Sequence, residues 1–229
     1  MQIVKEYIAG ITPQNLSLLP HDNWEAIRLG ANGRGFVSDA IMNAYAIREQ
    51  YIARVGFPIY TEETVATLVK FLKDKRVFDV GSGSGFLSAV LGINFIEVRA
   101  IDSDITTYSS GKRKNGSNWD YIYRKDVSSD AVDYLKTANK HGIPPDVIIM
   151  CWPDYQKTFA RDILKAMKPN QILIYQGEGS WGCTGDEEFH DMLNNPKIVT
   201  ELDYMSEKLN STHAQFEGIH DYWYVYKKV

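Results

Sequence analysis

The sequence has little of several features that would place it in a special class of protein. It holds two cysteines in 229 residues, Cys151 and Cys183, too few for a disulfide framework and without the spacing of a metal site. No apolar run approaches the length of about 18 residues that a membrane span needs. The first residues also lack the basic start and apolar core of a signal peptide. We therefore expect a soluble, cytoplasmic protein with reduced cysteines and neither a metal site nor a membrane partner.

The sequence also lacks an excess of positive charge. It has 25 lysines and arginines against 29 aspartates and glutamates, which gives a formal net charge of -4. Nucleic-acid-binding proteins usually carry a basic face, so a nucleic acid partner is possible but not favoured. The basic run at 112–114 is the main local exception, and such runs are usually solvated. Nothing in the composition indicates an oligomeric state.

Short apolar runs alternate with helical patterns from residue 57 onward, without an internal repeat. Helices are predicted at 62–72, 86–91, 128–139, 159–167 and 185–193, the last with a capping box formed by Thr184 and Glu187. Strands are predicted at 76–80, 97–102, 120–124, 146–151, 171–175, 198–205 and 221–228. The last two strands have only a loop between them, which predicts antiparallel pairing at a sheet edge. The pattern predicts an α/β fold with a doubly wound, mostly parallel sheet and helices on both faces.

The first 56 residues follow no sustained period, except for a helix predicted over 37–54. We interpret 1–56 as a helical segment that covers the site as a lid, and 57–229 as the main domain. Core packing would explain the aromatic residues of the segment equally well.

A glycine-rich turn, DVGSGSG at 79–85, lies between a predicted strand and a predicted helix. Small residues let the backbone pass close to a ligand, and the helix N-terminus presents free N–H groups. Asp102 ends the next strand, where a carboxylate can reach the ribose hydroxyls of a nucleoside held at the turn. NAD-binding folds share that spacing. Asp79 argues against NAD, because a carboxylate two residues before Gly81 suits a cationic amino group and repels a pyrophosphate.

The stretch VFDVGSGSGFL at 77–87 resembles the first motif of the class I S-adenosylmethionine-dependent methyltransferases. The resemblance covers residues 58–228 and implies a Rossmann-like fold with S-adenosylmethionine as the cofactor. It implies that Asp79 and Gly81 lie against the methionine part and that Asp102 holds the ribose. The implied cofactor-binding residues are Asp79, Gly81, Ser82, Gly83, Gly85, Asp102, Ser103, Asp126, Val127 and Cys151.

The adenine end of the cofactor is expected near Asp126, in the sequence RKDV. The resemblance implies that Asp126 binds the adenine amino group, with Val127 as its apolar companion and Ile105 or a neighbour packed on the ring. A helix N-terminal carboxylate stabilised by the helix dipole is the alternative for Asp126.

The segment after the fourth strand partly resembles the Asn/Asp/Ser-Pro-Pro-Tyr/Phe turn of methyltransferases that act on amino groups of nucleobases or glutamine. Pro153 and Tyr155 match that turn, whereas Trp152 and Asp154 depart from it. Trp152 and Tyr155 are suited to stacking on a flat or cationic acceptor, although packing at an interface explains them as well. The turn is still expected to form the edge of the pocket.

Glu178, among three glycines after the fifth strand, is the candidate for binding the acceptor or taking its proton, and Tyr155 and Asp154 are the other catalytic candidates. Methyl transfer from a sulfonium needs mainly alignment and exclusion of water, so a dedicated catalytic residue is not required. We therefore expect a methyltransferase acting on a small molecule or a protein side chain, with the acceptor atom, nitrogen or oxygen, left open. The alternatives are a nucleobase or RNA amino methyltransferase, an NAD-dependent oxidoreductase, and a non-catalytic partner subunit that binds cofactor.

Overall fold

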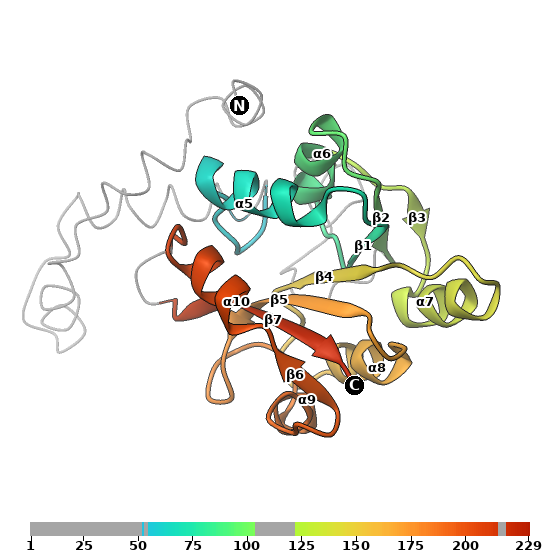
Figure 1. Cartoon of the computed structure of the whole chain (residues 1–229), viewed down its shortest axis with the longest axis vertical. Coiled ribbons are helices and arrows are strands. Elements are labelled where there is room, and N and C mark those ends of the chain that lie inside the picture. Colours follow the sequence, from blue (N-terminus) through green and yellow to red (C-terminus); the bar gives the residue numbers. More distant parts are fainter. Residues whose placement is uncertain (1–51, 53–54, 104–121, 215–218) are drawn as a thin grey trace, which may run out of the picture.

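The computed structural model describes residues 52, 55–103, 122–214 and 219–229 (Figure 1). The helix predicted over 37–54, the lid assigned to 1–56, the basic run at 112–114 and Ile105 lie wholly or almost wholly outside these ranges. The strands are β1 (Val77–Val80), β2 (Val98–Asp102), β3 (Val127–Ser128), β4 (Val147–Cys151), β5 (Ile172–Glu178), β6 (Val199–Glu201) and β7 (Asp221–Lys228). The helices are α5 (Glu62–Leu72), α6 (Phe86–Ile93), α7 (Ala131–Lys140), α8 (Phe159–Ala166), α9 (Glu187–Leu193) and α10 (Asp203–Asn210).

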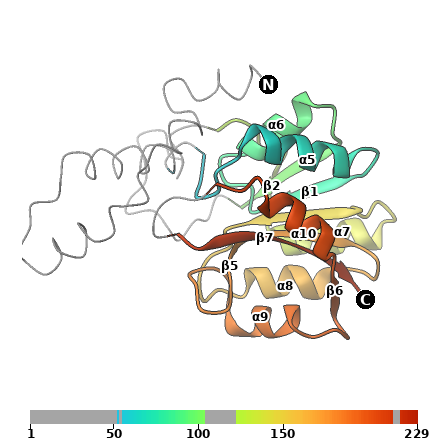
Figure 2. The same ribbon diagram turned by 60° about the vertical axis from the view of Figure 1, so that its left-hand side comes forward.

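The strands form one seven-stranded sheet in the order β3-β2-β1-β4-β5-β7-β6. The first five strands pair in parallel, and β7 runs antiparallel to both β5 and β6. Helices cover both faces of the sheet (Figure 2). One apolar cluster joins α5, α6 and α10 to the sheet, and a second joins α7, α8 and α9 to its other face. The predicted α/β fold, with its mixed sheet and antiparallel last strand, is confirmed.

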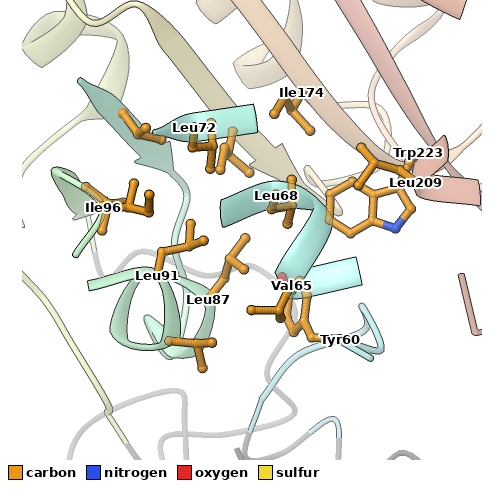
Figure 3. Packing of buried hydrophobic residues seen from close by; sticks show 14 of the residues in the cluster. Tyr60, Val65, Leu68, Leu72, Leu87, Leu91, Ile96, Ile174, Leu209 and Trp223 are labelled. Atoms are coloured by element: carbon orange, nitrogen blue, oxygen red, sulfur yellow. The ribbon is translucent and has the colours of Figure 1, made fainter. Parts of the chain in front are cut away.

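Helix α5 shows how the local sequence determines an element. The Thr61 side chain accepts a hydrogen bond from the Thr64 N–H and caps the helix, and two glutamates occupy its first turn. Val65, Leu68 and Leu72 form the buried stripe, which packs beside Leu209 of α10 and Trp223 of β7 (Figure 3). The stripe closes the face of the sheet on which the site described below is built.

Three predictions about the elements are wrong. No strand forms at 122–124, the described part of the predicted 120–124, because the Tyr123 N–H donates to the Ser84 carbonyl (2.8 Å) and draws the segment over the glycine turn. The predicted strand 198–205 shortens to β6, and α10 stands between β6 and β7, with Met205 and Leu209 in the core. Asp186, not Thr184, caps α9, accepting the Phe189 N–H at 2.9 Å.

Strand β5 is longer than predicted and reaches Glu178, since Gln176, Gly177 and Glu178 pair with Trp223, Tyr222 and Asp221 of β7. The residues after the predicted strand therefore lie on a buried sheet and not in a loop. Among the helices of the described ranges, none combines the length and the apolar character that crossing a bilayer would require.

Candidate functional site at the carboxyl edge of the sheet

The strand order reverses between β1 and β4, because β2 and β3 extend the sheet on one side and β5 extends it on the other. Ligands of open α/β sheets bind outside the carboxyl ends of the strands at such a switch point. The turn at 81–85 follows β1 at this point, and the turn at 152–155 follows β4. The fold therefore brings the predicted cofactor turn and the predicted acceptor turn to the same edge.

The backbone of the glycine turn has a conformation that residues with a side chain rarely adopt. Gly81, Gly83 and Gly85 have φ values of 66°, 56° and 70°, in the left-handed region. A Cβ atom on Gly85 would lie 1.7 Å from the carbonyl oxygen of Arg124. The hydroxyl of Ser82 is buried and, within the described part of the chain, has no hydrogen-bond partner. The turn thus offers a helix N-terminus without a side-chain cap and an orphaned polar atom, both of which suit a polar ligand.

Two carboxylates flank the turn. Asp79 is 3% exposed and accepts a hydrogen bond from the Ser88 hydroxyl at 2.7 Å. Burial raises the pKa of Asp79 to about 7, and the nearby charge of Asp102 acts in the same direction. Asp102, at the end of β2, accepts the Gly83 N–H at 2.8 Å. A cation bound beside Asp79 would favour the ionised form of this carboxyl group. An anion in the same place would be repelled by Asp79 and Asp102.

Asp126 extends the pairing of β2 with β3. Its carboxylate accepts the Ala100 N–H (2.9 Å) and the Arg124 Nε–H (2.9 Å), and its own N–H donates to the Ala100 carbonyl (3.1 Å). The alternative role as a helix N-terminal carboxylate is wrong, because α7 begins at Ala131 and Asp130 caps it. Val127 follows in β3, paired with Ile101, and Ser103 directly follows β2. The adenine contact of Asp126 stays a prediction.

Trp152 is held in an unusual conformation at the end of β4. Its φ of 50° lies in the left-handed region, which is rare for a bulky residue and typical of functional sites. Its N–H donates to the Gln176 carbonyl (2.8 Å), its ring stacks on Phe57 at 4.5 Å between centroids, and its indole N–H donates to Asp221 (2.9 Å). Three contacts thus fix Trp152, one of the two residues that depart from the amino-methyltransferase turn.

Of the predicted catalytic residues, Tyr155 lies on the surface and Glu178 is already hydrogen-bonded. Tyr155 is 50% exposed, and it follows Asp154 on the turn after β4. The two carboxylate oxygens of Glu178 accept the Cys183 N–H (2.6 Å) and the His220 N–H (3.0 Å). Glu178 therefore ties together the segments that follow β5 and precede β7. Its role toward an acceptor stays a prediction.

A buried polar network around Asp221 was not predicted from the sequence. Asp221 is 1% exposed and accepts hydrogen bonds from Trp152, from the Gln176 amide and from His213 Nε2, the last at 3.0 Å. The Trp223 indole, which can only donate, points its N–H at His213 Nδ1 (3.2 Å), so the His213 proton lies on Nε2. Strand pairing brings these residues together, and their spacing along the chain gives no signal.

Cys151, at the end of β4, lies between the glycine turn and the polar network around Asp221. Its thiol is hydrogen-bonded to Tyr60, and burial raises its pKa, with the charges of Asp79 and Asp221 adding to the effect. Both carboxylates are therefore near the same thiol. The thiol stays neutral, and Cys151 is a small half-buried residue between the cofactor turn and the Asp221 network.

Three solved structures illustrate what the chain is similar to. The SMU.776 protein in complex with S-adenosylhomocysteine is 14% identical, with a TM-score of 0.45, covering 82% of this chain and 65% of that protein. The S-adenosylmethionine-dependent methyltransferase from Agrobacterium tumefaciens is 12% identical, with a TM-score of 0.40 and coverage of 72% and 59%. A variant of MtNAS in complex with S-adenosylmethionine is 12% identical, with a TM-score of 0.43 and coverage of 83% and 67%.

The chain spans only 65% and 59% of the length of the first two. No protein-family model and no curated protein matches the sequence. The fold is established by the strand pairing of this chain, and likeness at these identities and TM-scores adds no argument about its activity.

Proposed function

We propose that the chain is an S-adenosylmethionine-dependent methyltransferase that acts on a small molecule or a protein side chain. The observation that carries the proposal is the buried Asp79 beside a turn of three left-handed glycines at the switch point of the sheet. A carboxylate in that position complements the ammonium group of a methionine moiety. Asp102 at the next strand end complements a ribose.

The residues of the turn and its neighbours fit this cofactor. Asp79 would bind its ammonium group, Asp102 its ribose hydroxyls, and the orphaned Ser82 hydroxyl another polar atom of it. Asp126, Val127, Ser103 and Cys151 complete the proposed lining, together with the backbone of Gly81, Gly83 and Gly85. When bound, S-adenosylmethionine supplies an electrophilic methyl group on a positively charged sulfur.

The chain itself would supply alignment and exclusion of water. The turn at 152–155 borders the acceptor side, where Trp152 is fixed by Phe57 and Asp221. Tyr155, Asp154 and Glu178 are the proposed groups for contacting an acceptor or taking its proton. Of these, Glu178 would have to act while its oxygens also hold two backbone N–H groups.

The site favours this cofactor over NAD. Asp79 is ionised above a pH of about 7, and its charge then opposes a pyrophosphate at the turn. A nucleic acid acceptor would likewise bring phosphates toward Asp79, Asp102 and Glu178. The rival worth testing is a non-catalytic subunit that binds cofactor, because Trp152 occupies the place of the polar residue that begins the amino-methyltransferase turn.

Transfer of a labelled methyl group tests the activity. The purified chain is incubated with S-adenosylmethionine labelled in the methyl group and with separate fractions of small molecules, protein and tRNA. Label in the small-molecule or protein fraction is the expected result. Label confined to tRNA would favour the nucleobase alternative. Cofactor binding without label in any fraction would favour the partner subunit.

A further inference from the structure

The carboxyl half of the sheet carries a row of polar side chains on a single face. Asp79, Cys151 and Gln176 alternate along their strands with residues of the opposite cluster, and Gln176 follows Ile174, which packs in the same cluster as Trp223. Cys151 is paired with Gln176, and Gln176 with Trp223. The row therefore runs from the cofactor turn after β1, across β4, to β5 and β7.

Gln176 has a hydrogen-bonding atom that the protein does not use. Its Nε2 donates to the Asp221 carboxylate, and because a carboxylate can only accept, the orientation of the amide is fixed. Its Oε1 is buried, and among the described residues no group donates to it. The whole residue is 0% exposed. Buried acceptors without a donor are rare and costly, so Oε1 indicates a ligand that brings an N–H or O–H group.

The carboxyl groups on the same face of the sheet indicate which kind of N–H or O–H donor would bind beside Gln176. Asp79, Glu178 and Asp221 place three carboxyl groups around the row. Within the described ranges no lysine or arginine forms an ion pair with Asp79 or Glu178, and the His213 ring donates a hydrogen bond to Asp221. Such a face attracts a group that can carry positive charge and repels carboxylates and phosphates. An amine meets both requirements, since it donates N–H and can become a cation.

We propose that Gln176 Oε1 and the Asp221 carboxylate form the acceptor subsite, and that the methyl acceptor is an amine. The proposal rests on the proposed methyltransferase function. The neutral amine donates an N–H to Gln176, and its nitrogen lone pair attacks the methyl carbon. The carbon–sulfur bond breaks, its electron pair stays on sulfur as a thioether, and a nitrogen–carbon bond forms. The positive charge thus moves from sulfur to nitrogen, where Asp221 stabilises it until the proton leaves to solvent.

The chemistry of the labelled product tests the proposal without any variant. Binding of S-adenosylmethionine is measured first by calorimetry, and its failure would overturn the methyltransferase function itself. Products are then labelled from metabolite and protein fractions and treated with alkali, which releases methyl esters and leaves N-methyl groups intact. Alkali-stable label retained on a cation exchanger supports the amine. Alkali-labile label, label that is not retained, or no label despite cofactor binding overturns it.

A matched pair of variants tests the residue. Gln176→Met removes Oε1, together with the Nε2 donor to Asp221, while keeping the size of the side chain. We expect kcat/KM for the labelled amine to fall about tenfold or more with little change in cofactor affinity. Gln171→Met is the control at the other end of β5, because the Gln171 amide donates to the Pro145 carbonyl (2.8 Å) and accepts the Lys168 N–H (2.7 Å). Unchanged kcat/KM in Gln176→Met, or an equal fall in the control, overturns the role of Gln176. If Gln176→Met fails to fold, the product test decides.

Discussion

Gly85→Ala should destabilise the protein far more than an alanine at another left-handed glycine. Gly85 has a φ of 70°, and a Cβ there would lie 1.7 Å from the Arg124 carbonyl oxygen and 2.9 Å from the Arg124 backbone nitrogen. Gly142 has a φ of 75°, and a Cβ there would meet nothing within 4 Å. The two positions share the backbone strain and differ in the contact, so the pair separates the two effects.

The expected magnitudes follow from that difference. Strain of a left-handed alanine costs about 1–2 kcal/mol, and this is all that Gly142→Ala should lose. Gly85→Ala adds the displacement of a backbone segment that cannot rotate away, about 1–3 kcal/mol or more by analogy with overpacked cores. Its total loss should therefore be about 2–5 kcal/mol, which lowers the Tm by about 4–20 °C for a domain of this size.

Urea denaturation of both variants and the unsubstituted chain measures the comparison, with circular dichroism as the readout. Cofactor titration on the same samples should show weakened binding in Gly85→Ala alone, because Arg124 and Asp126 must move away from the turn. Equal losses of unfolding free energy in the two variants would contradict this prediction, since the contact with Arg124 would then contribute nothing.

Three further changes test other parts of the site. Because the pKa of Asp79 is about 7, S-adenosylmethionine affinity should weaken as the pH falls below that value, and titrations of Asp79→Asn should show weak binding with no such dependence. The folded-state pKa of Asp79 lies above its ordinary 3.8, so its neutral form contributes stability that is lost as pH rises through about 7. Asp79→Asn should then resist urea better than the unsubstituted chain at pH 8, and a less stable variant would contradict this. Asp102→Ala should weaken cofactor binding at least about tenfold in calorimetry, through lost hydrogen bonds of about 1.5–3 kcal/mol. An unchanged Kd would show that Asp102 does not bind the ribose. Trp152→Phe keeps the ring on Phe57 but deprives Asp221 of one donor, so it should cost about 1–3 kcal/mol in thermal unfolding, and full stability would show that the bond is dispensable.

Elements whose signals are local could be predicted from the sequence. Helix α5 carries its cap at Thr61 and its apolar stripe within the same short segment, and β1 with its glycine turn is equally self-contained. Elements whose structure depends on distant contacts could not be predicted in this way. The segment around Tyr123 has the composition of a strand, but its N–H bonds to Ser84 across the turn. Helix α10 was missed because only Met205, Leu209 and the small Ser206 face the core.

The residues of the site likewise fall into those that a local pattern predicts and those that distant contacts bring together. Asp79, Gly81 and Asp102 follow from the strand, turn and strand pattern, because parallel strands end at a common edge. Gln176, His213 and Asp221 come together only through the antiparallel pairing of β5 with β7 and the short connection after α10. Glu178 stood out in the sequence as a carboxylate among glycines, but the same pairing places it at a strand end with backbone partners.

Calorimetric titration of the unsubstituted chain with S-adenosylmethionine, S-adenosylhomocysteine and NAD, in parallel at pH 8, determines which of these cofactors the chain binds. At this pH Asp79 is ionised and distinguishes an ammonium group from a pyrophosphate. We expect saturable binding of S-adenosylmethionine and of S-adenosylhomocysteine, and no binding of NAD. Binding of NAD with none of either adenosyl compound would contradict this expectation.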